Sequence, residues 1–217
     1  MNSELTRDME ESKKLFHISE PIIKQLLLSI TNLFVDNNLK IYCTEKQDTD
    51  LNKHLDCSCG VDYVISDAKG RTIELAWRAV KSKLIQYPNN GVYNAFSLRR
   101  KRNNGTPEEN CELAKRITAV TLGLAHPQYT AQVHYDPLDN DSLLSLAIAR
   151  SEDILNAYND GYWRECNPKN KDKEVFFRDV SWKLMREHGY DVYDWYRDVT
   201  CVPTTYLDVG EIQYKNI

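Results

Sequence analysis

Residues 60–78 read Gly60-Val61-Asp62-Tyr63-Val64-Ile65-Ser66-Asp67-Ala68-Lys69-Gly70-Arg71-Thr72-Ile73-Glu74-Leu75-Ala76-Trp77-Arg78 and predict a β-hairpin that turns at Asp67 to Gly70. Side chains of a strand alternate between the two faces of a sheet. One face of this hairpin therefore carries mostly apolar side chains. The other carries Asp62, Glu74 and Arg78, two carboxylates and a guanidinium that together are able to hold a metal ion.

The chain as a whole has the composition of a soluble globular protein. It has 217 residues, of which 41% are hydrophobic and 28% charged, which predicts one domain with a C-terminal extension. We expect a cytoplasmic protein without a membrane partner, because no apolar run reaches about 18 residues and Met1 to Lys14 is polar. A net charge of −4 does not by itself indicate a nucleic-acid partner, so local patches matter more.

The six cysteines are spread thinly along the chain, which favours free thiols over a disulfide framework. Cys43, His54, Cys57 and Cys59 form a loose cluster that offers zinc ligands, but the spacing lacks paired Cys-x-x-Cys knuckles. A structural zinc site is therefore an open alternative.

Helical and strand periodicities predict the elements around the hairpin. Residues 1–15 form a polar arm, and residues 16–150 form the core. The core begins with a helix over 21–37 capped by Ser19, a strand over 39–44 and the hairpin. A short strand over 92–98 and a helix from Thr106 to Leu124 follow, and this helix buries Leu113, Ile117, Val120, Thr121 and Leu124. The core ends with a strand over 129–135 and a strand or helix over 143–149.

Residues 151–217 are predicted to be an extension that is rich in aromatic side chains. It contains a short helix from Ser151, an extended segment over 174–177, a helix capped by Asp179 that ends at His188-Gly189, and a final strand over 204–209. Trp182, Trp195 and their aromatic neighbours either belong to a core or interface, or stack on unpaired bases. A two-fold homodimer is an expectation for this segment.

The order helix, strand, strand, strand, helix, strand resembles the core of the PD-(D/E)XK nuclease superfamily over roughly residues 19–135. The hairpin quoted above carries the resemblance, with an acidic residue on the second strand and another, followed by a cation, on the third. The resemblance implies an α/β protein with a restriction-endonuclease-like αβββαβ core and a C-terminal α+β extension. Such proteins resemble those of phages and mobile elements.

The resemblance also implies a site. Asp62 and Glu74 match the family's ligands for Mg²⁺ or Mn²⁺, and Glu20 on the first helix offers a third carboxylate. The family pattern expects lysine where Ala76 stands. Arg78 then supplies the cation, as an electrostatic clamp that is unable to exchange a proton near neutral pH. Lys81 and Lys83 are further candidates for the cation.

The only dense basic run is Arg99-Arg100-Lys101-Arg102, which is able to bind a nucleic-acid backbone and is otherwise a solvated hairpin tip. The leading hypothesis is a Mg²⁺-dependent endonuclease acting on DNA. Its rivals are a catalytically inactive nuclease-fold module that binds DNA or inhibits another protein, and an adaptor that acts through the aromatic segment. In the simplest structural alternative, Glu74 pairs with Arg78 in a solvated ion pair.

Overall fold

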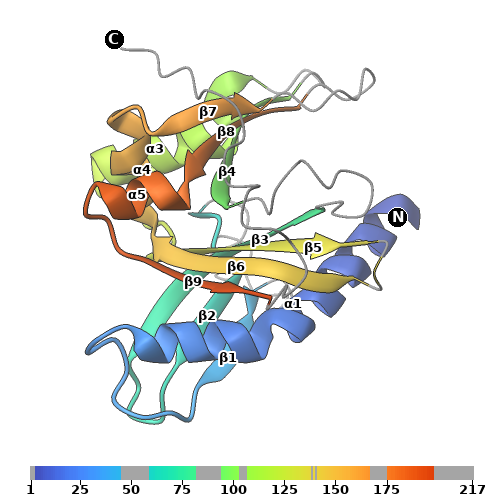
Figure 1. Cartoon of the computed structure of the whole chain (residues 1–217), viewed down its shortest axis with the longest axis vertical. Helices are drawn as coiled ribbons and strands as arrows, with labels where there is room; N and C mark the ends of the chain where they lie inside the picture. Colours follow the sequence, from blue (N-terminus) through green and yellow to red (C-terminus); the bar gives the residue numbers. More distant parts are fainter. Residues whose placement is uncertain are drawn as a thin grey trace.

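The computed structural model describes residues 3–44, 59–81, 94–102, 107–137, 139, 141–166 and 175–197. These residues form a mixed α/β structure with a large six-stranded sheet, a small three-stranded sheet and four α-helices (Figure 1). The predicted α/β fold class is confirmed.

The large sheet has the strand order β1-β2-β3-β5-β6-β9. Its strands are β1 (Lys40–Cys43), β2 (Tyr63–Ser66), β3 (Thr72–Lys81), β5 (Tyr129–Asp136), β6 (Ser142–Arg150) and β9 (Val192–Tyr196). Only β3 and β5 pair in parallel, and the other neighbours are antiparallel. With α1 (Ser3–Ser29) before β1 and α3 (Glu112–Leu122) before β5, the large sheet and these two helices follow the predicted αβββαβ order, and one strand of the second sheet lies between β3 and α3.

The small sheet has the order β4-β8-β7, formed by β4 (Ala95–Arg102), β8 (Val175–Ser181) and β7 (Trp163–Cys166). The short 3₁₀ helix η3 (Glu108–Asn110) precedes α3. The two remaining helices of the described residues are α4 (Ser151–Asn159) and α5 (Trp182–Glu187). In Figure 1 this sheet and α3, α4 and α5 lie together above the large sheet, while α1 lies below it.

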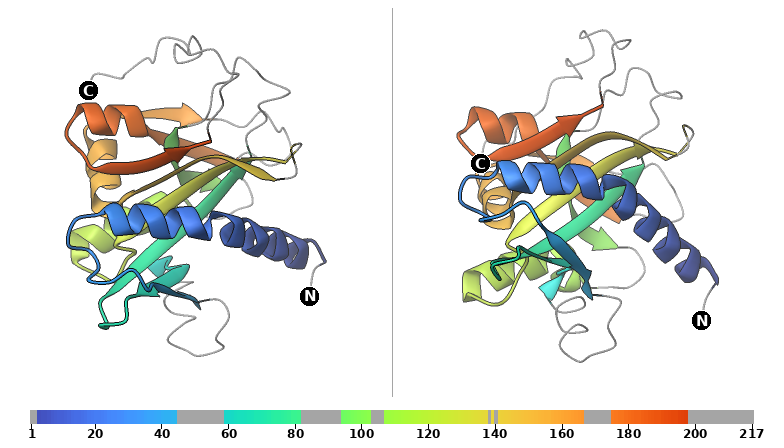
Figure 2. Two further views of the ribbon diagram at one scale, coloured as in Figure 1. Left: turned by 60° about the horizontal axis from the view of Figure 1, so that its bottom comes forward. Right: turned by 90° about the horizontal axis from the view of Figure 1, so that it is seen from below.

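The two faces of the large sheet pack against different partners because its side chains alternate. Tyr63, Leu75 and Val133 point toward α1 and share a core with Phe16 and Leu27; this is the helix that crosses the sheet in Figure 2. A second core contains residues of β4, β8, α3, α4, α5 and the opposite face of β6: Phe96, Leu98, Leu113, Ala147, Ala149, Ile154, Leu155, Ala157, Val180, Trp182 and Met185. The even-numbered residues of β2, β3 and β5 therefore face the α3 side.

The hairpin forms as the sequence predicts. Asp67 is buried at the turn, where its carboxylate accepts hydrogen bonds from the backbone N–H groups of Val35 (3.0 Å), Lys69 and Arg71 (both 2.9 Å). These bonds lower the pKa of Asp67, with the Val35 N–H as the largest cause. Gly70 has a φ of 82°, a conformation that side chains disfavour, and it closes the turn.

The N-terminal part differs from the prediction. Helix α1 runs unbroken from Ser3 to Ser29, instead of a polar arm followed by a helix over 21–37. The reason is that Leu15 and Phe16 are buried in the core and extend the apolar stripe of the helix toward its N-terminus. The Ser19 hydroxyl donates to the carbonyl of Phe16 within the helix at 2.9 Å, so Ser19 is not a cap.

The α3 region also starts later than predicted. Cys111 is the N-cap, and Thr106 lies outside the described residues. The predicted burial of Leu113 is confirmed. Thr121 is exposed within the helix, and Leu124 is exposed beyond the end of the helix at Leu122.

The C-terminal part contributes more structure than the sequence indicates. Residues 142–150 are strand β6, so the helical alternative for this segment is wrong. Ser181, not Asp179, caps α5, because its hydroxyl accepts from the Leu184 N–H at 3.4 Å. Strand β9 falls in a segment predicted as irregular and pairs with β6, so it completes the large sheet. The strand predicted over 204–209 lies outside the described residues.

Candidate active site

Asp62 immediately precedes β2 and lies near Arg116 of α3, because its charge opposes the lowering of the pKa of that arginine by burial. Its backbone N–H donates at 3.0 Å to the carbonyl of Leu75, the residue that pairs with Tyr63. The Asp62 Oδ2 atom accepts a hydrogen bond from the backbone N–H of Trp77 at 2.6 Å. This bond ties the Asp62 carboxylate to β3 at Trp77, the residue before Arg78.

Glu74 pairs in register with Val64, so its side chain lies on the face of the sheet that α3 covers. The side chain is half-buried, and within the described part of the chain its carboxylate forms no ion pair. Burial raises the pKa of the Cys59 thiol, and the negative charge of Glu74 raises it further. Asp62 and Glu74 therefore both lie on the α3 side of the sheet.

Arg78 shares that face but turns toward the small sheet and α3. Its guanidinium donates to the carbonyl of Ser97 on β4 and forms an ion pair with Glu112, the first residue of α3. The ring of Phe177 lies beneath it, 5.6 Å from the guanidinium carbon to the ring centroid. The structural alternative in which Glu74 pairs with Arg78 is therefore wrong.

Helix α3 adds two site residues that the sequence analysis did not identify, Glu112 and Arg116. Arg116 Nη2 lies 3.0 Å from Glu112 Oε1, and Nη1 donates to Thr130 Oγ1 at 2.9 Å. Burial lowers the pKa of Arg116 and the charge of Arg78 lowers it further, whereas Glu112 and Asp62 act in the opposite direction. Asp62, Arg78, Glu112 and Arg116 are thus one electrostatic cluster.

Strand β4 closes the side of this cluster. The Gln132 side chain on β5 accepts from the Ser97 N–H at 2.7 Å and donates to the Ser97 hydroxyl at 3.1 Å. Because Gln132 is buried and pairs in register with Arg78, these bonds hold β4 across the sheet beside the guanidinium. The small sheet therefore forms one wall of the site.

Three predicted site residues are not brought to this face or fall outside the description. Glu20 lies on α1, where its carboxylate pairs with Lys24 at 2.8 Å and with His17 at 3.6 Å. Lys81 pairs with Glu11 of α1 at 3.0 Å. Because α1 covers the opposite face of the sheet, neither joins Asp62 and Glu74. Lys83 lies outside the described residues.

The basic run Arg99 to Arg102 belongs to strand β4. Arg100 forms ion pairs with Glu108 at 2.7 Å and Glu165 at 3.2 Å, and the hydrogen bond that it donates to Glu108 is the largest cause of its raised pKa. Arg99 is half-buried and shares a strand face with Ser97. Lys101 and Arg102 have no described side chains, so the prediction that this run binds nucleic acid stays a prediction.

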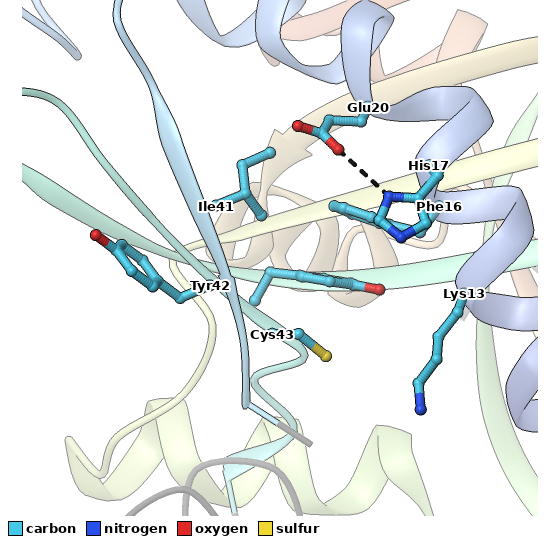
Figure 3. Close-up of a pocket in the computed structure, with 8 residues that line it drawn as sticks. Lys13, Phe16, His17, Glu20, Ile41, Tyr42 and Cys43 are labelled. Atoms are coloured by element: carbon cyan, nitrogen blue, oxygen red, sulfur yellow. Dashed lines mark ion pairs between the residues drawn. The ribbon is translucent and has the colours of Figure 1, made fainter. Parts of the chain in front are cut away.

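A pocket of about 250 Å³ lies on the other side of the sheet, between α1 and the β1–β2 pair (Figure 3). It is lined by Lys13, Phe16, His17, Glu20, Ile41, Tyr42, Cys43 and Tyr63. Glu20 points toward His17 at its rim. Cys43 lines this pocket, whereas Cys59 lies near Glu74; His54 and Cys57 fall outside the described residues, so zinc binding stays an open alternative.

Among the described residues, no group of three or more histidine, cysteine, aspartate and glutamate side chains is arranged to hold a metal ion. Mg²⁺ keeps several waters and binds proteins through one or two carboxylates together with substrate phosphates. That Asp62 and Glu74 hold such an ion stays a prediction. None of the described helices is long and apolar enough to cross a membrane.

Comparisons with known proteins give one structural similarity. No protein-family model matches the chain, and no curated protein matches its sequence. A solved structure of a nuclease from a fusselovirus is similar, with a TM-score of 0.33 and 16% sequence identity over 83% of this chain and 85% of that chain. A TM-score this low supports no inference about function, which has to come from the site.

Proposed function

We propose that the protein is a metal-dependent phosphodiesterase of the PD-(D/E)XK type that cleaves DNA internally. One observation carries the proposal: Asp62 and Glu74 lie on the α3 side of the β2–β3 pair, and within the described part of the chain Glu74 forms no ion pair. Mg²⁺ binds through one or two carboxylates together with water and substrate phosphates.

Asp62 and Glu74 would hold Mg²⁺ or Mn²⁺, which supplies an activated water and shields the attacked phosphodiester. The chain itself positions these groups. The Trp77 N–H donates to Asp62 Oδ2 and so orients that carboxylate. Arg78 acts on the phosphate as a fixed positive charge, because a guanidinium does not exchange its proton near neutral pH.

The test compares plasmid cleavage by the wild-type protein, Asp62→Asn, Glu74→Gln and Glu109→Gln with Mg²⁺ or Mn²⁺. Asparagine still accepts the Trp77 N–H, so Asp62→Asn removes the charge and keeps that hydrogen bond. Glu109 is an exposed residue of η3 and provides a matched loss of charge. The assignment is supported if the wild type and Glu109→Gln alone cleave, and equal cleavage by the wild type and all three variants would falsify it.

A second function has support from Ala76. The cation expected at this position is absent, and Arg78 is engaged by Glu112. A nuclease fold without catalysis, which binds DNA or inhibits another protein, accounts for both features. Salt-sensitive DNA binding with no cleavage under any divalent metal distinguishes this function from the first.

A further inference from the structure

Ala76 of β3 pairs in register with Thr130 of β5, so both lie on the face of the sheet that α3 covers. Arg116 of α3 donates to the Thr130 hydroxyl at 2.9 Å. Asp62, just before β2, is close enough to Arg116 for its charge to oppose the lowering of the pKa of that arginine by burial. The Arg116 guanidinium therefore lies beside Ala76, which is only 3% exposed. Arg116 brings a positive charge from the helix to the place where a lysine at position 76 would hold one.

Arg78 is the second positive charge of the same surface. It follows Ala76 by two residues on β3 and so shares its face. Arg78 and Arg116 converge on Glu112, where Arg78 binds Oε2 and Arg116 lies 3.0 Å from Oε1. Two guanidinium groups thus bind one carboxylate, each through a different oxygen of Glu112.

Guanidinium groups bind carboxylates and phosphates with the same geometry, through hydrogen bonds to two oxygens. We infer that Arg78 and Arg116 form a two-arginine site for a phosphodiester group, and that Glu112 occupies this site in the free protein. A bound phosphate displaces the Glu112 carboxylate. The inference rests on the proposed function and deepens it, since it names a second phosphate-binding residue and the group that competes with the substrate.

The exchange is electrostatically balanced. A phosphodiester and the Glu112 carboxylate each carry one negative charge, so the two arginines keep the same compensation when one replaces the other. Glu112 is the first residue of α3 and its side chain is 20% exposed, so it reaches solvent without unfolding the helix. A displaced carboxylate is then hydrated, which offsets part of the free energy lost when it leaves the two guanidinium groups.

The test measures binding of a fluorescein-labelled DNA oligonucleotide by anisotropy in EDTA, over a series of salt concentrations. Glu112→Gln removes the competing charge, and Glu109→Gln is the matched control in the preceding 3₁₀ helix. We expect Glu112→Gln to bind about tenfold more tightly than the control, equivalent to one charge-assisted hydrogen bond. The slope of log affinity against log salt should steepen by about 0.9, for one further phosphate contact. Equal or weaker binding than the control overturns the inference.

Two further variants identify the arginine responsible. Adding Arg116→Gln to Glu112→Gln should abolish the gain, and adding Arg197→Gln should leave it intact; retention of the gain without Arg116 contradicts the site. If Glu112→Gln does not fold, the guanidinium NMR signals of the wild type answer the same question. On addition of the oligonucleotide, those of Arg78 and Arg116 should shift, and unchanged signals refute the inference.

The inference and the proposed function fail separately. Tighter binding by Glu112→Gln, together with no cleavage by the wild type under Mg²⁺ or Mn²⁺, supports the two-arginine site and refutes the nuclease. Cleavage that depends on Asp62 and Glu74, together with unchanged binding by Glu112→Gln, supports the nuclease and refutes the two-arginine site.

Discussion

Replacing Arg116 by methionine should destabilise the protein by about 3 kcal/mol. The Arg116 side chain is only 12% exposed, and it interacts with Glu112 at 3.0 Å and with Thr130 at 2.9 Å. Removing one partner of a buried ion pair costs about 3–5 kcal/mol. The lower end applies because Glu112 keeps Arg78 and retains some contact with solvent. Methionine preserves much of the aliphatic packing of the arginine stem.

Urea and thermal unfolding measure this loss. For a chain of this size, about 3 kcal/mol corresponds to a fall in Tm of about 6–12 °C. Arg197→Met is the control, because Arg197 pairs with Asp139 at 2.7 Å and both side chains are about half exposed. Such a surface pair contributes about 0–1 kcal/mol. If Arg116→Met costs no more than Arg197→Met, the cluster under α3 is not a buried network and the reasoning fails.

Three further outcomes test the fold. Leu75→Ala should cost about 2–5 kcal/mol in urea unfolding, since Leu75 is fully buried, and Leu124→Ala, at 53% exposure, should stay within about 0.5 kcal/mol. Because the pKa of Asp67 is lowered in the folded protein, its contribution to stability is present above its unfolded pKa and is lost as pH falls through the folded pKa. Asp67→Asn should therefore reduce the loss of unfolding free energy between neutral and acidic pH, and an unchanged pH dependence refutes this role. Ser181→Ala should cost about 1 kcal/mol through the loss of the α5 cap, whereas Ser181→Asp should be close to neutral.

The αβββαβ order was predictable because its signals are local. The hairpin of residues 60–78 alternates with period two over both strands, and one sheet face is buried, which fixes its register. The N-terminal helix was harder to delimit, since Leu15 and Phe16 are apolar residues in a charged segment. Their burial depends on the sheet beneath them, which no local pattern of the helix reveals.

Part of the site was also accessible from strand parity. Arg78 lies an even number of residues after Glu74 and Lys81 an odd number, so the alternation of side chains already excludes Lys81 from the face of Glu74. Glu112 and Arg116 are different. Their i, i+4 spacing is typical of a solvated ion pair on a helix surface. No sequence pattern indicates that α3 packs this pair against the charged face of the sheet.

The charge balance at the site separates its structural members from its functional ones. Arg78 and Arg116 carry two positive charges, which Glu112 and Asp62 compensate. A balanced, mostly buried cluster of this kind is able to serve folding alone, so its existence does not distinguish a nuclease from an inactive relative. Glu74 adds a third negative charge for which the described residues supply no ion-pair partner. Glu74 lies outside the balanced cluster, so we expect Glu74→Gln to reduce the proposed cleavage while changing the free energy of unfolding less than Arg116→Met does.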